Sequence, residues 1–361
     1  MRAFSASDPC AKGRIPSRRP RAFAAAPVAA APVVALASAC SGIQSSNGRD
    51  GSQAAMIGGL FDMFLWTAVI VYLLVMLYLA AALWRGRRRR LAGEGLQGEP
   101  SAQAERRWRI ALIVFAAATA MILAGLSFAT WFTDRLLARS AEKPSLEVEM
   151  IGHQWWWEVR YKAAQSNIMV RTANELHLPA GRTARIILRS NDVIHSMWIP
   201  NLAGKQDLIP GRVTDLTVHP LRTGLFRAQC AEFCGMQHAK MALDVTVDAP
   251  VDFSRWYLAQ IKPPPLPTGG AALAGYRIFQ TRQCASCHAI AGMRASASVA
   301  PDLSHVASRR TIAAGTLKTS HSNMMRWIQD PQKPKPGNNM PKTPLTPGEL
   351  AALTAYMETL R

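Results

Sequence analysis

The sequence predicts a membrane-anchored, multidomain protein: a two-helix transmembrane hairpin, then a β domain, then a mostly helical C-terminal domain. Two long stretches without charge lie near the N-terminus, short alternating stretches follow them, and a helical pattern closes the chain. With 361 residues the chain has room for two modest domains besides a membrane segment. We therefore expect two folded domains attached to one membrane anchor.

Residues 1–39 are predicted to be a signal peptide. A basic region precedes an Ala/Val/Pro-rich run, and small residues lead up to Cys40, which is the layout of a secretory signal with its cleavage site. A cysteine directly after the cleavage point suits a lipoprotein-type junction, but Ala37 stands where such junctions favour Leu. Lipidation of Cys40 therefore stays open, and Cys10 lies in the part expected to be removed.

Two stretches long enough to cross a bilayer as helices, 63–84 and 110–133, carry no charged residue. A buried helix of a soluble protein is the alternative, but two such stretches argue against it. Residues 85–109 hold eight arginines against three glutamates, so this loop is expected to stay in the cytoplasm. We predict a hairpin within residues 40–143, with spans at about 58–84 and 110–133 and both ends outside the cytoplasm.

Residues 144–260 are expected to form a β domain. Alternating or β-branched stretches are separated by Pro- and Gly-containing turns, and they lie at 145–150, 183–188, 213–218 and 243–247. Short strands at such spacing are typical of a sandwich or barrel. The net charge of +19 falls outside this domain, in the signal region, the cytoplasmic loop and the C-terminal segment. That distribution argues against nucleic-acid binding.

The stretch that begins at Cys230 concentrates metal-binding side chains, because Cys234, His238 and Met241 follow at short intervals. Thiolate, imidazole and thioether ligands together favour copper. Two cysteines are enough for both thiolates to bridge two copper ions, which suits electron transfer and leaves no open position for substrate. His195 upstream can supply a second imidazole. The alternative is a C-x3-C disulfide outside the cytosol, but the spacing of four matched residues favours metal.

A second redox motif is Cys284-Ala-Ser-Cys287-His288, the attachment signature of c-type haem. In such motifs two thiols bind the haem covalently and the adjacent histidine reaches the iron. With both axial positions filled by protein, a haem carries electrons and does not bind oxygen. Residues 261–268 form a Pro-rich spacer before this segment, and residues 269–361 are predicted to form the cytochrome domain.

Met340 is the predicted second axial ligand, since a Met/His pair is typical of electron-transfer cytochromes. A helical pattern at 348–358 follows it, as in small class I cytochromes c, whose last helix packs against the first. Met324 and Met325 are rival ligands. They lie in an amphipathic stretch, however, and are expected to pack in a core.

These motifs resemble the copper A region of cytochrome c oxidase subunit II, and the surrounding sequence agrees at 152–158, 173–177, 192–196 and 204–211. The resemblance implies a cupredoxin-like Greek-key β-barrel. It also implies that Cys230 and Cys234 bridge the two coppers and that His195 and His238 bind one copper each. The remaining implied ligands are a weakly bound Met241 and the backbone carbonyl of Glu232.

The resemblance implies further roles. The Glu232 carboxylate would also reach a magnesium ion at the boundary with subunit I, and Trp155 would be the residue at which electrons enter copper A. Relatives served by a diffusing basic cytochrome c carry acidic residues just after the tryptophans, whereas residues 160–165 contain none. A tethered donor would explain this departure, because a linker raises the effective concentration without charge steering. The fused cytochrome points to the caa3-type form of subunit II.

The implied function is that of subunit II of a proton-translocating cytochrome-c oxidase. A bc1 complex or a cytochrome c would supply electrons to haem c. The electrons would then pass through copper A to haem a of subunit I. Subunit I, with haem a3 and copper B, would reduce oxygen, and subunit III would be a further partner. The expected location is a bacterial inner membrane, with both redox domains on the periplasmic side.

Three alternatives fit part of the sequence. A soluble nitrous oxide reductase also uses dinuclear copper, but the two spans and the cytochrome argue against it. A copper A subunit of a nitric oxide reductase differs mainly in its partner. A membrane-anchored electron carrier would need one anchor only, whereas a hairpin offers a face to another subunit.

Glu105 resembles the family's carboxylate near the proton entrance, or it is an ordinary surface residue.

Overall fold

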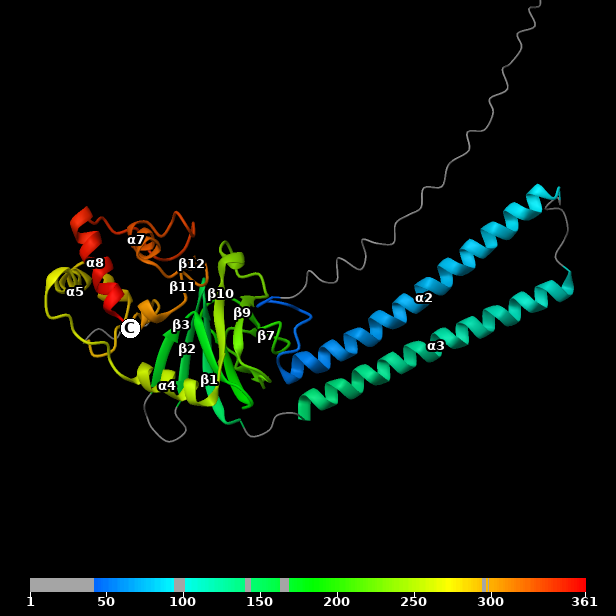
Figure 1. Ribbon diagram of the computed structural model, residues 1–361, viewed down its shortest axis with the longest axis horizontal. Helices are drawn as coiled ribbons and strands as arrows, with labels where there is room; N and C mark the ends of the chain where they lie inside the picture. Colours follow the sequence, from blue (N-terminus) through cyan, green and yellow to red (C-terminus); the bar gives the residue numbers. More distant parts are fainter. Residues whose placement is uncertain (1–41, 94–100, 140–143, 163–168, 294–296, 298) are drawn as a thin grey trace, which may run out of the picture. The chain divides into compact units, whose positions relative to one another are not determined.

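The computed structural model describes residues 42–361 apart from 94–100, 140–143, 163–168, 294–296 and 298. The predicted signal peptide, Cys10, Cys40 and residues 163–165 therefore lie outside the described residues. Among the described residues, two apolar helices precede a β domain, which a helical domain follows (Figure 1). The predicted fold class is confirmed.

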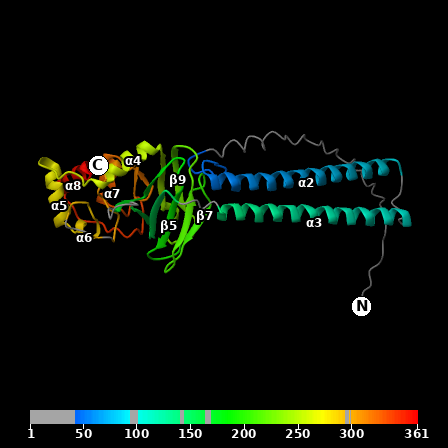
Figure 2. The same ribbon diagram turned by 90° about the horizontal axis from the view of Figure 1, so that it is seen from below.

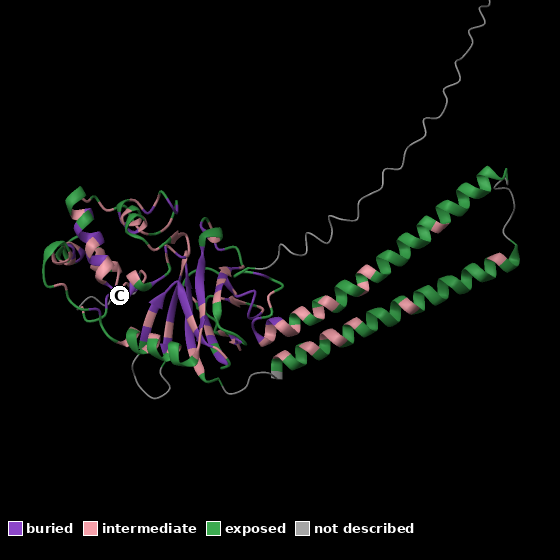
Figure 3. Cartoon of the chain, viewed as in Figure 1, coloured by how far each residue is buried: buried purple, intermediate pink, exposed green. Residues whose placement is uncertain are grey.

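The two N-terminal helices are α2 (Ser52–Leu91) and α3 (Ala102–Arg139), which lie side by side (Figures 1 and 2). Both are long and apolar enough to cross a membrane. Their side chains are mostly exposed (Figure 3), as expected where lipid rather than protein covers them. Each helix extends beyond its predicted span, and basic residues in the last turn of α2 stabilise its C-terminal end.

The β domain contains two five-stranded sheets in the described part of the chain, with orders β3-β2-β1-β5-β8 and β4-β10-β9-β6-β7. The strands are β1 (Leu146–His153), β2 (Trp156–Lys162), β3 (Met169–Ala173), β4 (Glu175–Pro179), β5 (Ala184–Ser190), β6 (His195–Trp198), β7 (Lys205–Leu208), β8 (Thr214–Val218), β9 (Gly224–Cys230) and β10 (Ala242–Asp248). Their buried faces form one apolar core (Figure 3). Two packed sheets around one core agree with the cupredoxin-like domain expected from the sequence.

Strand register determines where the cysteine loop lies. In the antiparallel pair β6–β9, Met197 lies opposite Cys230, and in the pair β9–β10, Ala242 lies opposite Gln229. The segment from Ala231 to Met241 is therefore the connection between two paired strands. This segment is called the cysteine loop. The sheet fixes both of its ends close to His195, the first residue of β6.

A helix occupies the last part of the stretch that the sequence predicts as β structure. α4 (Pro250–Ile261) begins with proline at its first turn, a favoured position because the missing N–H needs no partner there. Phe253, Trp256 and Tyr257 recur at helical spacing and pack against the β core. The aromatic periodicity was the overlooked signal.

The C-terminal domain is mostly helical. Its elements are α5 (Gly270–Thr281), α6 (Cys284–Cys287), a 3-10 turn (Val306–Ser308), β11 (Thr311–Ile312), β12 (Leu317–Lys318), α7 (His321–Gln329) and α8 (Pro347–Thr359). A capping box between Thr346 and Glu349 begins α8. The last helix packs against α5, as expected for a class I cytochrome c, and Phe279 and Tyr356 meet in the shared core.

The crossing of α5 and α8 depends on Gly275. A Cβ atom at this position would lie 2.0 Å from the carbonyl oxygen of Ala352, a backbone atom that cannot move aside without separating the helices. We predict that Gly275→Ala destabilises the C-terminal domain by roughly 3 kcal/mol or more, the upper range for overpacked cores. Thermal loss of haem absorbance in the full chain measures this.

Gly348→Ala is the matched control, because a Cβ there meets no atom within 4 Å. Its unfolding midpoint should equal that of the unaltered chain. If Gly275→Ala and Gly348→Ala unfold at the same temperature, the close helix crossing is wrong.

Candidate functional site

The cysteine loop is closed at its base by hydrogen bonds. The amide of Cys230 donates to the carbonyl of Met241 at 2.9 Å. The Gln229 side-chain amide lies 3.3 to 3.4 Å from the carbonyls of His238, Ala239 and Met241. These contacts bring the end of the loop back to its start, so residues twelve positions apart face one another.

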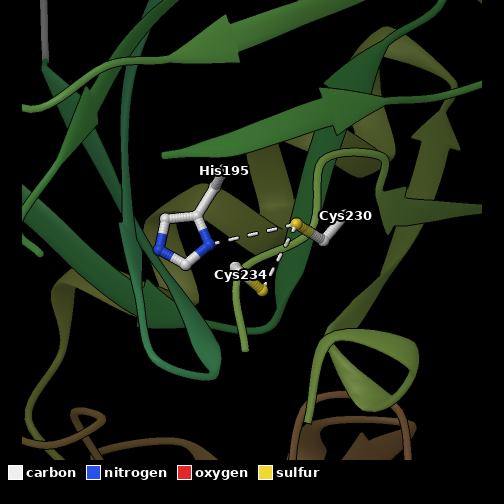
Figure 4. A group of neighbouring side chains, drawn as sticks. All are labelled: His195, Cys230 and Cys234. Carbon is white, nitrogen blue, oxygen red and sulfur yellow. Dashed lines mark hydrogen bonds between the residues drawn. The ribbon is translucent and has the colours of Figure 1, made fainter. Parts of the chain in front are cut away.

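Three sulfur atoms gather inside this loop. The Sγ atoms of Cys230 and Cys234 lie 3.8 Å apart, and the Sδ of Met241 is 3.8 Å from Cys234 Sγ. A disulfide would require about 2.05 Å, and both cysteines are free thiols, each 2% exposed. The disulfide alternative therefore does not describe this structure. The two buried thiols of the loop therefore face each other (Figure 4).

Each cysteine has an imidazole beside it. His195 Nδ1 lies 3.9 Å from Cys230 Sγ (Figure 4), and His238 Nδ1 lies 3.6 Å from Cys234 Sγ. Asp192 Oδ1 lies 2.7 Å from His195 Nε2. Because a carboxylate only accepts, this pairing places a proton on Nε2 and turns Nδ1 toward the sulfurs.

The two thiols titrate unequally. The hydrogen bond with the Cys234 thiol lowers the pKa of Cys230 well below its ordinary value, although burial opposes the shift. The same contact raises the pKa of Cys234 well above its ordinary value. A ready thiolate, two imidazoles and a thioether are donors of the kind that soft metal ions take. His195, Cys230 and Cys234 form a cluster whose donor atoms all lie within 4.8 Å, a fit to a copper site.

The two predicted roles of Glu232 differ in their support. Its backbone carbonyl lies 3.2 Å from Cys230 Sγ, close to the sulfur cluster. Its side chain is exposed and is not part of the metal-type cluster found among the described residues. The predicted magnesium site has no support among those residues.

A second site is a cavity of about 460 Å³ in which the haem motif lies. Cys284 and Cys287 occupy the two ends of the single helical turn α6, and both line the cavity together with His288 and Met340. Residues of the β domain complete the wall: His153, Gln154, Trp155 and Trp156. The cavity and its two thiols fit a covalently attached haem.

His288 is oriented by the backbone. Its Nδ1 lies 2.8 Å from the carbonyl of Pro301, which can only accept, so Nδ1 carries the proton and Nε2 a lone pair. Burial lowers the pKa of His288, which favours the neutral ring. A neutral imidazole with one nitrogen held by a carbonyl is the form that binds a metal.

The predicted methionine ligand and one of its rivals both reach the cavity. Met340 lies on a segment held by two hydrogen bonds, from its amide to Asn338 Oδ1 and from Gln332 Nε2 to its carbonyl, each 2.9 Å. Met324 also lines the cavity, but it is buried in the core of the C-terminal domain, as expected, and Met325 packs against that core.

Trp155 contacts both sites. Trp155 lines the haem-type cavity, and its Nε1 donates to the carbonyl of Cys234 at 2.9 Å. The Gln154 side chain donates to the same carbonyl at 2.8 Å. One residue thus belongs to the cavity wall and contacts a cysteine of the sulfur cluster.

The neighbouring tryptophans have different surroundings. Trp157 is fully buried in the β core, while Trp156 is half-buried and stacks on His153 with ring centroids 4.2 Å apart. Glu158 Oε2 lies 3.3 Å from His153 Nε2, and Arg160 and Arg171 pair with the other oxygen of Glu158. This network supports the cavity wall from behind.

Comparison with known proteins identifies both domains. Residues 162–248 match the family described as cytochrome c oxidase subunit II, periplasmic domain, and residues 272–361 match the cytochrome c family. The chain therefore joins a domain of the subunit II periplasmic type to one of the cytochrome c type, behind two helices long and apolar enough to cross a membrane. The subunit II domain implies copper A, and the cytochrome domain implies haem c.

The chain is similar to curated proteins named cytochrome c oxidase subunit 2. The Alkalihalophilus pseudofirmus protein is 31% identical over 215 residues, which are 59% of this chain and 61% of the relative. The Bacillus subtilis protein is 31% identical over 234 residues, 62% of this chain and 64% of the relative. The chain thus spans somewhat less than two thirds of these relatives.

Among solved structures, the periplasmic domain of subunit II of cytochrome oxidase from Bradyrhizobium japonicum is 28% identical, with a TM-score of 0.31. The match covers 33% of this chain and 95% of the chain in the solved structure. The chain combines the subunit II periplasmic domain with a cytochrome c domain and is consistent with a caa3-type fused subunit II.

Three residues with clear structural roles were missed at the sequence level. Asp192 orients His195 and stands three residues before it, so its position in the motif was a usable signal. Gln229 and Lys335 act on backbone carbonyls that are distant in sequence or in another domain. No local pattern marks such contacts.

The network behind the cavity wall predicts an acid-sensitive contribution to stability. Burial alone would raise the pKa of Glu158, but hydrogen bonds from His153 and Arg160 and the charges of Arg160 and Arg171 lower it to about 2. A depressed carboxyl pKa stabilises the fold above the ordinary value near 4.5 and ceases to do so as pH falls toward 2.

We predict that Glu158→Gln lowers the stability of the metal-free chain at pH 7 by at most about 3 kcal/mol, following from the size of the shift. The difference between the two proteins should shrink between pH 4.5 and 2. Urea titrations followed by tryptophan fluorescence measure it. A difference that stays constant over this range would contradict the assignment.

Proposed function

We propose that this chain is subunit II of a haem–copper terminal oxidase. Electrons from an external donor would pass through haem c to dinuclear copper A and on to haem a of subunit I, where oxygen is reduced to water with proton translocation. The observation that carries this proposal is the position of Trp155, which lines the haem-type cavity and hydrogen-bonds to Cys234. The oxygen chemistry belongs to the complex, a cytochrome-c oxidase.

The proposed copper ligands are the clustered donors: His195, Cys230, Cys234, His238, Met241 and the carbonyl of Glu232. Copper bound there supplies one-electron redox chemistry. The chain's own residues keep water away by burial, orient His195 through Asp192 and hold the loop through Gln229. Rigid ligands suit electron transfer, because little geometry has to change.

The proposed haem ligands are Cys284 and Cys287 as attachment sites, with His288 and Met340 as axial ligands. Trp155 is proposed as the residue at which electrons enter the copper site. A half-buried, neutral His288 and a methionine are the axial pair of cytochromes that carry electrons and do not bind oxygen.

The proposed organisation follows the sequence: signal peptide 1–39, hairpin 40–143, copper A domain 144–260, spacer 261–268 and cytochrome 269–361. Two apolar helices and a periplasmic-type domain describe a membrane-anchored protein with its folded domains outside the cell interior. We propose a bacterial inner membrane, subunit I and subunit III as partners, and a bc1 complex or a cytochrome c as donor. The similarity to oxidase subunits disfavours the nitric oxide reductase and free-carrier alternatives.

Copper content tests the ligand assignment. Cys230→Ser or Cys234→Ser removes a thiolate shared by both metals, so either should abolish the dinuclear centre and its mixed-valence spectrum. Met241→Leu removes a weak ligand, so it should retain the pair with an altered potential and some copper loss. Metal analysis and electron paramagnetic resonance measure these outcomes.

Met236→Leu is the matched control in the same loop, because its side chain is exposed and takes no part in the sulfur contacts of Cys230, Cys234 and Met241. It should keep two coppers. Binding of a single copper by the unaltered chain, or a Cys230–Cys234 disulfide without metal, would rule out the copper A assignment.

The rate of electron transfer from haem c to copper tests Trp155. Trp155→Ala removes both the ring in the cavity wall and the bond to Cys234, so it should slow the transfer by roughly 10- to 100-fold with both cofactors bound. Trp155→Phe keeps a ring without the donor and should be intermediate. Flash reduction of haem c followed by copper absorbance measures the rates. Unchanged transfer in Trp155→Ala would move the point of electron transfer elsewhere.

A further inference from the structure

Lys335 is a buried lysine in the segment that leads to Met340, and only 3% of its surface is exposed. A cation removed from water is costly unless its donors are satisfied. No carboxylate of the described residues lies within ion-pair distance of it. Its ammonium instead donates to three backbone carbonyls, at 2.7 Å (Trp155), 2.8 Å (Lys240) and 3.3 Å (Ala313).

The three acceptors come from three different parts of the molecule. Trp155 lies in the cavity wall and is bonded to Cys234. Lys240 directly precedes Met241 at the end of the cysteine loop. Ala313 lies in the turn between β11 and β12 of the cytochrome domain. An ammonium has three donors, so the Lys335 ammonium joins the cysteine loop, the cavity wall and the cytochrome at a single point.

The neighbouring contacts have the same character. Lys240 Nζ donates to the carbonyl of Pro334 at 2.7 Å, and Gln237 Nε2 donates to that of Pro336. Asn339 Nδ2 donates to the carbonyl of Gln154 at 2.9 Å. Side-chain donors from each domain thus meet main-chain acceptors of the other. Salt screens pairs of charges far more than it weakens buried hydrogen bonds to carbonyls.

We propose that Lys335 is a positioning residue for electron transfer between the two redox sites. It holds segment 331–340 of the cytochrome against the cysteine loop. Trp155 can then line the haem-type cavity and hydrogen-bond to the carbonyl of Cys234 at the same time. This inference rests on the proposed function, in which haem c delivers electrons to copper A.

The chemistry of lysine suits this position. Burial and the charge of Lys240 lower the pKa of Lys335 to about 7, whereas the three carbonyls favour the charged form, because a neutral amine has two donors and leaves one acceptor without a partner. A methionine of similar length would fill the space and leave all three carbonyls unpaired. Unpaired buried carbonyls favour hydration and separation of the two surfaces.

Amine acetylation of the full, metal-free chain tests the docking independently of any electron transfer. Lys333, two residues away, is exposed and provides an internal reference. Lys335 should react at least about 10-fold more slowly than Lys333, because labelling requires local opening. Equal labelling would overturn the docking and would leave the copper and haem assignments untouched.

The variants Lys335→Met, Lys335→Arg and Lys333→Met in the assembled oxidase test the positioning role. Lys335→Met should slow transfer from haem c to copper by roughly 10- to 100-fold, with unchanged copper and haem spectra, and should make the rate depend on ionic strength. Lys335→Arg keeps several donors and should restore part of the rate. Lys333→Met should match the unaltered enzyme.

Hydrogen exchange in the metal-free chain keeps the proposal testable if Lys335→Met binds its cofactors poorly. Exchange of residues 236–241 should rise in Lys335→Met and stay unchanged in Lys333→Met. Equal transfer rates in Lys335→Met and Lys333→Met, or equal exchange in both, would overturn the proposal. Loss of the copper signal in Cys230→Ser concerns the proposed function alone, so the two failures are distinguishable.

Discussion

The pairing of β9 with β6 and β10 is the constraint on which the rest of the site depends. It fixes Cys230 at a strand end, returns Met241 to its side and places His195 at the start of the adjacent strand. Strand pairing alone therefore brings the donors together. Since the ladder of a buried sheet resists slippage, the geometry of the sulfur cluster depends on the stability of the whole β core and little on the loop itself.

The sequence predicted those parts of the fold and site whose signals are local. The strands at 145–150 and 243–247 alternate clearly and correspond to β1 and β10. The short strand β6 lacks such a run, and α4 was hidden because its aromatic spacing followed directly on β structure. The thiols of the cysteine loop were visible as a motif, whereas Gln229 and Lys335 act on carbonyls that only folding brings near. Local pattern cannot reveal a partner that is defined by topology.

Charge near the tryptophans has a different role from the one its sequence position suggests. In the sequence, the basic stretch after the tryptophans indicates that no acidic docking surface is present there. In the structure, however, Arg160 pairs with the buried carboxylates of Glu158 and Glu149. Its charge is therefore used inside the domain, to support the wall on which His153 and Trp156 stack. A residue that is counted as surface charge in the sequence can be structural in the fold.

On the proposed electron path, from haem c to copper A within one chain, the contacts between the cysteine loop and the cytochrome make charge steering dispensable. A diffusing donor gains from long-range attraction, because encounter limits its rate. A donor in the same chain is always near, so the orientation of its haem relative to the copper site becomes limiting instead. Hydrogen bonds from Lys335 and Asn339 to main-chain carbonyls are directional and bind only when the surfaces are correctly aligned. On this proposal, fusion replaces attraction at a distance with alignment at contact, and the three carbonyl contacts of Lys335 are where that alignment is concentrated.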